Sequence, residues 1–338
     1  MNVLSLFDGM SCTQIALKNL GIKVDRYYAS EIDKYAIKVA RENFPKTIHL
    51  GDIKDITGSD FIYDIDLIVA GSPCQGFSFA GKQLAFDDPR SALFFEFVRL
   101  LREVKPKYFL LENVRMKKEF QNVISEQVSD IYPECNNGSL FGIEPIKINS
   151  ALVSAQSRNR LYWTNIPNIE QPKDLGIVLR DILEPSEDWG ERPQYLKNEF
   201  AGRERGSLVK DIDEKSACLN ATMYKGQISS YVKKKAYDTP KQVGTATNIK
   251  GYDIIKRVYS EDGKSPTLTT MGGGHREPKV VVKEEELTWR KLTPLECERL
   301  QTVPDNYTAA VSNTQRYKML GNGFTVKVIE HILTNMEI

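Results

Sequence analysis

The stretch "IDLIVAGSPCQGFSFAG", residues 65–81, joins a continuous apolar run to a turn that holds a single cysteine. The run "IDLIVAG" is typical of a strand that is buried on both faces, as strands of parallel sheets are. The proline and glycines that follow predict a turn directly after this strand, with Cys74 inside it. A buried cysteine is usually a small apolar side chain, but a turn offers it little to pack against. The position of Cys74 therefore indicates chemistry rather than packing.

Strand-like runs and helical patterns alternate on both sides of this stretch. They predict strands at 2–7, 23–31, 47–52, 65–71 and 107–113, and helices at 13–21, 33–44 and 91–104. This order is typical of an α/β fold with a mostly parallel sheet and helices on both of its faces. Ligands of such sheets bind beyond the carboxyl ends of the strands, so we expect the functional residues there.

The alternation ends after about Pro167, and residues 185–285 are polar and rich in Gly, Thr, Tyr and Lys. We interpret this region as a smaller, β-rich unit, and helical patterns return at 293–301 and 324–336. The net charge is only +1, but residues 187–283 hold 18 Lys and Arg against 13 Asp and Glu. This local excess gives weak support for a nucleic-acid-binding face.

The composition argues against several classes of protein. With 41% hydrophobic and 27% charged residues, the chain is typical of a globular protein with a full core. No apolar run approaches the roughly 20 residues that span a membrane. The start "MNVLSLFDGM" lacks the features of a signal peptide, so we expect a cytoplasmic location. The five cysteines form no C-x-x-C pair and the three histidines are far apart, so we expect no metal site.

Three residues at successive strand ends are typical of a nucleoside-binding site. Gly9 permits a tight turn and close backbone approach after the first strand. Glu31 ends the second strand, where an acid suits ribose hydroxyls, and Asp52 ends the third, where a carboxylate can accept from an exocyclic amine. Each acid alone is more often a solvated side chain or a helix cap. Together they place one candidate site at one edge of the sheet.

The catalytic candidates follow the fourth and fifth strands. Cys74 needs a lowered pKa or a nearby acceptor to act as a nucleophile, and no histidine is close in sequence, which disfavours a Cys-His hydrolase. Glu112 ends the fifth strand, where a buried carboxyl can hold a proton for transfer. Arg158 and Arg160, at i and i+2, share one face if they lie in a strand. The alternative readings are a loop-capping Glu112 and an exposed pair of arginines.

Six motifs occur in an order that resembles the DNA cytosine-5 methyltransferases. They are "FDGMSC", "SPCQGFS", "ENV", "QSRNR", "RKLTPLECERLQTVPDNYT" and "LGNGFTV". The resemblance covers the chain except about 185–285, where that family has its variable target recognition domain. It implies a Rossmann-like S-adenosylmethionine-dependent methyltransferase fold. It also implies a catalytic domain of residues 1–184 and 312–338, and a target recognition domain with its hinge at 185–311.

The resemblance implies a covalent mechanism in which Cys74 adds to C6 of cytosine. Glu112 would then contact N3, and Arg158 would hold the O2 carbonyl while Arg160 supports the site. C5 would take the methyl group from S-adenosylmethionine. Because a base inside a duplex cannot be reached in this way, the cytosine must be flipped out.

The same resemblance assigns the binding residues. The cofactor residues would be Phe7, Asp8, Gly9, Met10, Glu31, Ile32, Asp52, Ile53, Leu93 and Asn322. The DNA-binding residues in the loop after Cys74 would be Gln75 and Ser78. Composition rather than the resemblance predicts further DNA contacts in "SPTLTTMGGGHREPK", because glycine lets the main chain come close and threonine offers a hydroxyl and a methyl group; the candidates are Thr270, Gly272, Gly273, Gly274 and Arg276. The partner would be double-stranded DNA, bound by a monomer, with a cognate restriction endonuclease as a further candidate partner.

Some features depart from the family pattern, and other functions stay open. Ser11 and Cys12 stand where small glycines are usual in the first motif. RNA methylation at cytosine C5 is one alternative, and the large 185–285 insert favours duplex DNA over it. A non-catalytic DNA-binding relative is a second, which the presence of Cys74 and Glu112 disfavours. A dinucleotide-dependent oxidoreductase is a third, which the missing G-x-G-x-x-G disfavours.

Overall fold

The computed structural model describes residues 1–72, 92–135, 142–184, 195–197, 240–246, 249–268, 277–283 and 288–337. Seven strands form the larger of two sheets, in the order β3-β2-β1-β4-β5-β7-β6. Their bounds are Asn2–Leu6 (β1), Arg26–Ser30 (β2), Ile48–Gly51 (β3), Leu67–Gly71 (β4), Tyr108–Val114 (β5), Ile146–Asn149 (β6) and Asn159–Thr164 (β7). Strands β1 to β5 pair in parallel. Strand β7 runs in the opposite direction to the other six and is antiparallel to both of its neighbours, β5 and β6.

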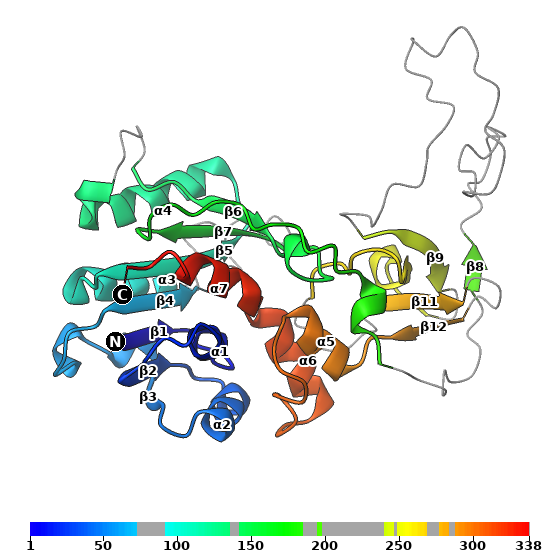
Figure 1. Ribbon diagram of the computed structural model, residues 1–338, viewed down its shortest axis with the longest axis horizontal. Helices are drawn as coiled ribbons and strands as arrows, with labels where there is room; N and C mark the ends of the chain where they lie inside the picture. Colours follow the sequence, from blue (N-terminus) through cyan, green and yellow to red (C-terminus); the bar gives the residue numbers. More distant parts are fainter. Residues whose placement is uncertain are drawn as a thin grey trace, which may run out of the picture.

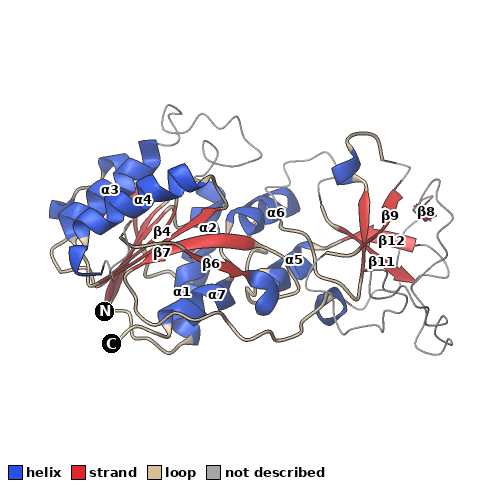
Figure 2. Ribbon diagram, turned by 90° about the horizontal axis from the view of Figure 1, so that it is seen from above, coloured by secondary structure: helices blue, strands red, loops and turns tan. Residues whose placement is uncertain are grey.

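The helices lie on both faces of this sheet because its strands are apolar on both faces. In β4, Leu67 and Val69 belong to one core, whereas Ile68 and Ala70 belong to the other. Helices α1 (Cys12–Asn19) and α7 (Val326–Leu333) cover the first core, while α3 (Ala92–Val104) and α4 (Lys118–Ile131) cover the second (Figure 2). Helix α2 (Lys34–Asn43) follows β2 and contributes Val39 to the first core. The α/β fold expected from the sequence is confirmed.

A second sheet of five strands lies in the later part of the chain. Its order is β12-β11-β10-β9-β8, with bounds Tyr195–Lys197 (β8), Gln242–Ala246 (β9), Arg257–Ser260 (β10), Lys279–Lys283 (β11) and Thr288–Lys291 (β12). Only the β10–β11 pair is parallel. Ala246, Ile249, Val258 and Val281 form its small core. The polar region therefore does contain β structure, as the sequence suggested, and the exact domain boundaries stay a prediction.

Helices α5 (Pro294–Leu300) and α6 (Asn313–Asn322) lie between the two sheets (Figure 1). Helix α5 begins with a capping box in which the Thr293 hydroxyl accepts from the Glu296 amide. Segments from both ends of the chain meet beside them, because α7 returns to pack on α1. Among the helices in the described ranges, none is both long enough and apolar enough to cross a membrane.

Candidate active site

A cavity of about 630 Å³ lies at the carboxyl ends of strands β1 to β5. Each strand contributes the residues that follow or end it, from Phe7 after β1 to Glu112 in β5. The opposite wall comes from distant parts of the chain: Thr267 and Leu268 after β10, and residues 321–324 at the end of α6 and directly after it. The site is therefore where a parallel sheet predicts it.

Nearly all described residues of the predicted cofactor set line this cavity. They are Phe7, Asp8, Gly9, Glu31, Ile32, Asp52, Ile53, Leu93 and Asn322. Met10 differs, because its side chain is 1% exposed and belongs to the core. Its backbone carbonyl accepts a hydrogen bond from the Tyr307 hydroxyl at 2.7 Å, which fixes the start of α1.

Glu31 organises the turn after β1. One carboxylate oxygen accepts from the Gly9 amide at 2.8 Å, and the other accepts from the amides of Ile32 and Asp33, both at 2.8 Å. Gly9 has a φ of 58°, a left-handed conformation that glycine adopts readily. Ser11 has a φ of 65° with a side chain present, which other residues adopt at a cost. The departure from glycine at Ser11 thus falls on a position with a glycine-like backbone.

Asp8 is a buried carboxyl in the cavity wall. Its two oxygens accept hydrogen bonds from the Ser11 hydroxyl and from the Tyr27 hydroxyl, the latter at 2.7 Å. Burial raises the pKa of Asp8 to about 6, although these hydrogen bonds oppose the increase. At neutral pH the wall therefore carries a negative charge that is shielded from water. The hydroxyl of Ser11 compensates in part for its strained backbone.

The outer part of the cavity combines an exposed apolar side chain with two strand-end carboxylates. Ile32 is 74% exposed, which is unusual for an isoleucine. Asp52 caps the short helix that follows β3, where its side chain accepts from the Lys54 amide at 3.1 Å. Ile53, which is buried, completes this part of the wall. An apolar surface between Glu31 and Asp52 suits a flat ring joined to a ribose.

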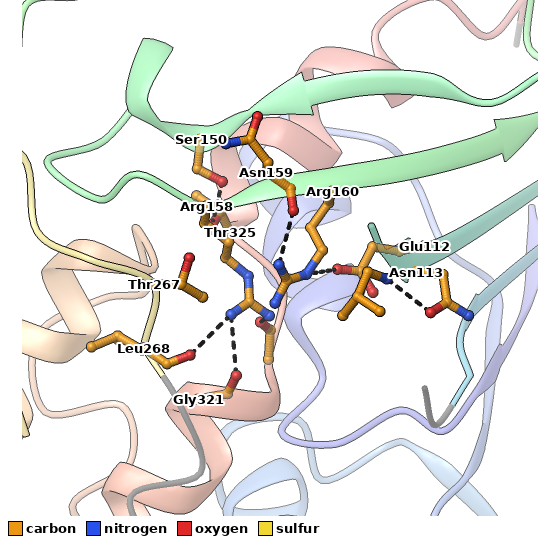
Figure 3. Close-up of polar contacts among 12 residues, drawn as sticks. Glu112, Asn113, Ser150, Arg158, Asn159, Arg160, Thr267, Leu268, Gly321 and Thr325 are labelled. Carbon is orange, nitrogen blue, oxygen red and sulfur yellow. Dashed lines mark hydrogen bonds and ion pairs between the residues drawn. The ribbon is translucent and has the colours of Figure 1, made fainter. Parts of the chain in front are cut away.

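Glu112 and Arg160 form an ion pair at the inner end of the cavity (Figure 3). The Arg160 Nε and Glu112 Oε1 atoms are 2.9 Å apart, and both side chains are largely buried. These two atoms nevertheless have no aligned hydrogen-bond partner within the described residues. Strand β5 brings Glu112 there and the antiparallel β7 brings Arg160. This pair can donate and accept toward a polar molecule in the cavity.

Arg158 lies one residue before β7, so the expected pair of arginines on one strand is only partly correct. Both arginines line the cavity, but Arg158 is 3% exposed. Its guanidinium donates to the carbonyls of Leu268 at 3.4 Å, Gly321 at 3.2 Å and Gly323 at 3.1 Å (Figure 3). Arg158 therefore joins two segments of the opposite wall.

The predicted nucleophile and the predicted DNA-reading residues lie outside the described residues. These are Cys74, Gln75, Ser78, Thr270, Gly272, Gly273, Gly274 and Arg276. The chain reaches the site just before Cys74, because Gly71 and Ser72 line the cavity. The Asn113 side chain donates to the Ser72 hydroxyl at 3.0 Å, so "ENV" also fixes the end of β4.

Sequence reasoning missed several residues of the wall. Thr267, Leu268 and Phe324 line the cavity. The stretches "SPTLTTMGGGHREPK" and "LGNGFTV" contain them, but none of the three was predicted to lie in this wall. Cys12 also lines it, and burial raises the pKa of the Cys12 thiol to about 12. This second thiol thus stays protonated at neutral pH and is a poor nucleophile.

Comparison with known proteins agrees with this architecture. Among curated proteins, the orphan methyltransferase M.SPBetaI of Bacillus phage SPbeta is 30% identical, with 99% of this chain and 97% of that protein covered. The type II methyltransferase M.HhaI of Haemophilus parahaemolyticus is also 30% identical, over 99% of this chain and 94% of that protein. The crystal structure of the S. pombe Dnmt2 methyltransferase shares the fold, with a TM-score of 0.62, 19% identity and coverage of 99% of this chain and 97% of that one.

The sheet order and the cavity at its carboxyl edge belong to an α/β fold, which the S. pombe methyltransferase structure shares. The model of the C-5 cytosine-specific DNA methylase family matches residues 1–337, so the chain belongs to that family. It is an enzyme that methylates C5 of cytosine in DNA.

Proposed function

We propose that the methyl donor is S-adenosylmethionine and that the substrate is a cytosine flipped out of duplex DNA. One observation carries this proposal: a single cavity joins Glu31, Ile32 and Asp52 at one end to the Glu112–Arg160 pair at the other. The first set fits an adenosine, because two carboxylates flank an exposed apolar side chain. The buried Asp8 carboxylate fits a cationic sulfonium. When bound, this cofactor supplies the electrophilic methyl group.

The protein's own groups activate the base. The Cys74 thiolate forms a bond to C6, and the electron pair of the C5–C6 double bond becomes available at C5. Glu112 shares a proton with N3, and a guanidinium at O2 stabilises the charge that the ring accumulates. After methylation, loss of the C5 proton and of the C6–S bond restores the aromatic ring.

The contacts support a different division of roles between the two arginines. The sequence assigned the O2 carbonyl to Arg158 and the supporting role to Arg160. Arg158 instead donates to three backbone carbonyls, whereas Arg160 is paired with Glu112 at the inner end of the cavity. We therefore assign the O2 contact to Arg160 and the support of the wall to Arg158.

The rest of the assembly follows the sequence-based expectations. Residues 1–184 and 312–338 form the catalytic domain, and 185–311 form the target recognition domain with its hinge. The sheet β8 to β12 supports this division because it falls within the second range. The protein acts on double-stranded DNA as a monomer in the cytoplasm. A cognate endonuclease stays a prediction, since M.SPBetaI is named an orphan methyltransferase and M.HhaI a type II methyltransferase.

Trapping with 5-fluorocytosine tests this function. Fluorine cannot leave C5 as a proton does, so duplex DNA that contains 5-fluorocytosine should form a stable adduct with the wild-type protein and S-adenosylmethionine. Cys74→Ala should form none and should transfer no labelled methyl group, while circular dichroism shows that it is folded. Cys135→Ala, which changes a thiol away from the cavity, should behave as wild type.

The same assay distinguishes the alternatives. Labelled methyl transfer to RNA rather than to duplex DNA would contradict the assigned substrate. An adduct that persists in Cys74→Ala but disappears in Cys12→Ala would assign the nucleophile to Cys12 instead.

A further inference from the structure

Lys264 is a charged side chain buried between the two halves of the molecule. It is 1% exposed, and its ammonium donates to the carbonyls of Ala151 at 2.7 Å, Ser154 at 3.2 Å and Ile177. An ammonium has three N–H donors, and its burial is tolerated only where they find acceptors. Ala151 and Ser154 lie in the β6–β7 connection, and Ile177 lies in the segment after β7. Lys264 therefore ties the turn after β10 to the side of the larger sheet.

Residues 264–268, which we call the strap, continue from this lysine along the β6–β7 connection. The Ser157 amide donates to the Ser265 carbonyl, and the Thr267 hydroxyl donates to the Ser157 carbonyl, both at 2.8 Å. The Leu268 amide donates to the buried Gln156 side chain at 2.9 Å. The strap thus lies against the residues that lead directly into Arg158.

The far end of the strap meets the active site. Leu268 lines the cavity, and its carbonyl accepts from the Arg158 guanidinium (Figure 3). The same guanidinium donates to the carbonyl of Gly321 in the last turn of α6 and to that of Gly323 directly after this helix. Lys264 therefore holds one end of the strap, and the Arg158 guanidinium donates to the carbonyl of Leu268 at the other end.

We propose that Lys264 is a positioning residue that acts through the strap to place Arg158 in the wall of the cavity. This inference rests on the proposed function, because it concerns the support of that site. Without the ammonium, three buried carbonyls lose their donor and the strap is held less firmly. The Leu268 carbonyl and the Arg158 guanidinium then lose their fixed separation.

A double-mutant cycle tests this role. The variants are Lys264→Met, which keeps the length of the side chain but removes the donors, Arg158→Lys, and the two combined. The readout is the single-turnover rate of methyl transfer at saturating unmethylated genomic DNA and labelled S-adenosylmethionine. We expect Lys264→Met to lower this rate roughly tenfold, and the double variant to be no slower than Arg158→Lys alone, because residues that act through one hydrogen-bond network are not additive.

Lys279→Met is the matched control. Lys279 is also buried, at 2% exposed, but its ammonium donates to the carbonyls of Ile255 at 2.7 Å and Glu277 at 3.0 Å, on the side of the smaller sheet. Both methionine variants should lose thermal stability, so the rates are measured where all variants are folded. Only Lys264→Met should couple to Arg158→Lys. When Lys279→Met is combined with Arg158→Lys, the two fold-reductions in rate should multiply.

Each outcome decides the proposal. A wild-type rate for Lys264→Met, or effects that multiply as those of Lys279→Met do, would overturn it. If Lys264→Met does not fold, the same cycle uses Thr267→Val, which removes one contact of the strap at a half-buried position. A wild-type protein that forms no 5-fluorocytosine adduct would contradict the proposed function and not this inference.

Discussion

Asp8 is a single residue whose charge links the cavity to pH. Because burial raises its pKa from 3.8 to about 6, the folded protein retains a proton that the unfolded chain has already lost in this interval. Stability therefore decreases as pH rises from about 4 to about 6, by at most ~3 kcal/mol for this residue.

Asp8→Asn should remove this dependence. We expect the unfolding free energy of the wild type to fall relative to that of Asp8→Asn as pH rises from 4 to 7. Denaturant titrations over this pH range measure both values. Asp33→Asn is the control of opposite sign, and its titration extends below pH 4, because the pKa of Asp33 is lowered from 3.8 and its effect on stability is lost below that value. Partial burial would raise the pKa of Asp33, but hydrogen bonds from Lys318 and from the Tyr35 amide outweigh it and lower this pKa. The ionised Asp33 carboxylate therefore stabilises the fold, and this stabilisation is lost as pH falls. Equal pH profiles for wild type and Asp8→Asn would contradict the role of Asp8.

Glu112→Gln should separate binding from chemistry. The amide can still donate toward N3 but cannot exchange a proton with it, so we expect the methylation rate to fall by roughly 10²-fold or more. Calorimetric binding of S-adenosylhomocysteine should be unchanged, since the carboxylates proposed for the adenosine lie at the other end of the cavity. An unchanged rate at saturating substrate would show that Glu112 has a structural role only.

At the scale of elements, the loop between α6 and α7 depends on the absence of a side chain at Gly323. A Cβ there would lie 2.9 Å from the Met10 Cε, 3.2 Å from the Met319 carbonyl oxygen and 3.3 Å from the Cys12 Sγ. Gly323→Ala should therefore lower the unfolding free energy by about 1–3 kcal/mol, the usual cost of overpacking, and should weaken cofactor binding.

Thermal denaturation and calorimetry measure these two effects. Because the closest obstructing atom is the end of a flexible side chain, adding Met10→Leu should recover part of the loss. If Met10→Leu recovers none of the lost unfolding free energy, the backbone oxygen of Met319, rather than the Met10 side chain, limits the space at Gly323.

The sequence predicts elements well where the pattern is local. The apolar run 65–71, followed in the sequence by proline and glycines, predicts a buried strand, and β4 is found at Leu67–Gly71. Strand-end residues such as Glu31 and Asp52 are also predicted, because a parallel sheet brings its carboxyl ends to one edge.

Contacts between distant segments could not be predicted in this way. The sequence "EDGKSPTL" is typical of an exposed polar turn, yet Lys264 is buried by residues that precede it by more than 80 positions. The spacing of Arg158 and Arg160 likewise predicted only that they share one face of a strand. Their difference arises because the carbonyls of Leu268, Gly321 and Gly323 reach Arg158 from far along the chain.

At the scale of the whole molecule, we expect the choice of DNA sequence to depend on contacts from the stretch that follows the strap. We expect Arg276 to contact either a base or a phosphate. If it reads a base, Arg276→Ala should relax the choice of methylated sequence and cost roughly 1–3 kcal/mol of binding free energy. If it binds a phosphate, the variant should weaken all sites alike and reduce the salt dependence of binding.

Sequencing of methylated cytosines and salt titrations of DNA binding distinguish the two outcomes. Lys107→Ala is the control, because Lys107 lies at the start of β5, away from the cavity, where it donates to the Glu337 carbonyl at 2.7 Å. If Arg276→Ala matches this control in site choice, affinity and salt dependence, the reading surface lies elsewhere. The next candidates are then two stretches that resemble "TLTTMGGG" (267–274) in their Thr and Gly positions, "LNATMYKG" (219–226) and "GTATNIKG" (244–251).

The packing of α7 on α1 also bears on synthesis. Residues 321–324, which close the same cavity as Phe7 to Gly9, are made more than 300 residues after them. The Asn19 side chain donates to Glu330 at 2.6 Å, so the two segments also stabilise each other. The cavity therefore has both of its walls only after residues 321–324 have been made.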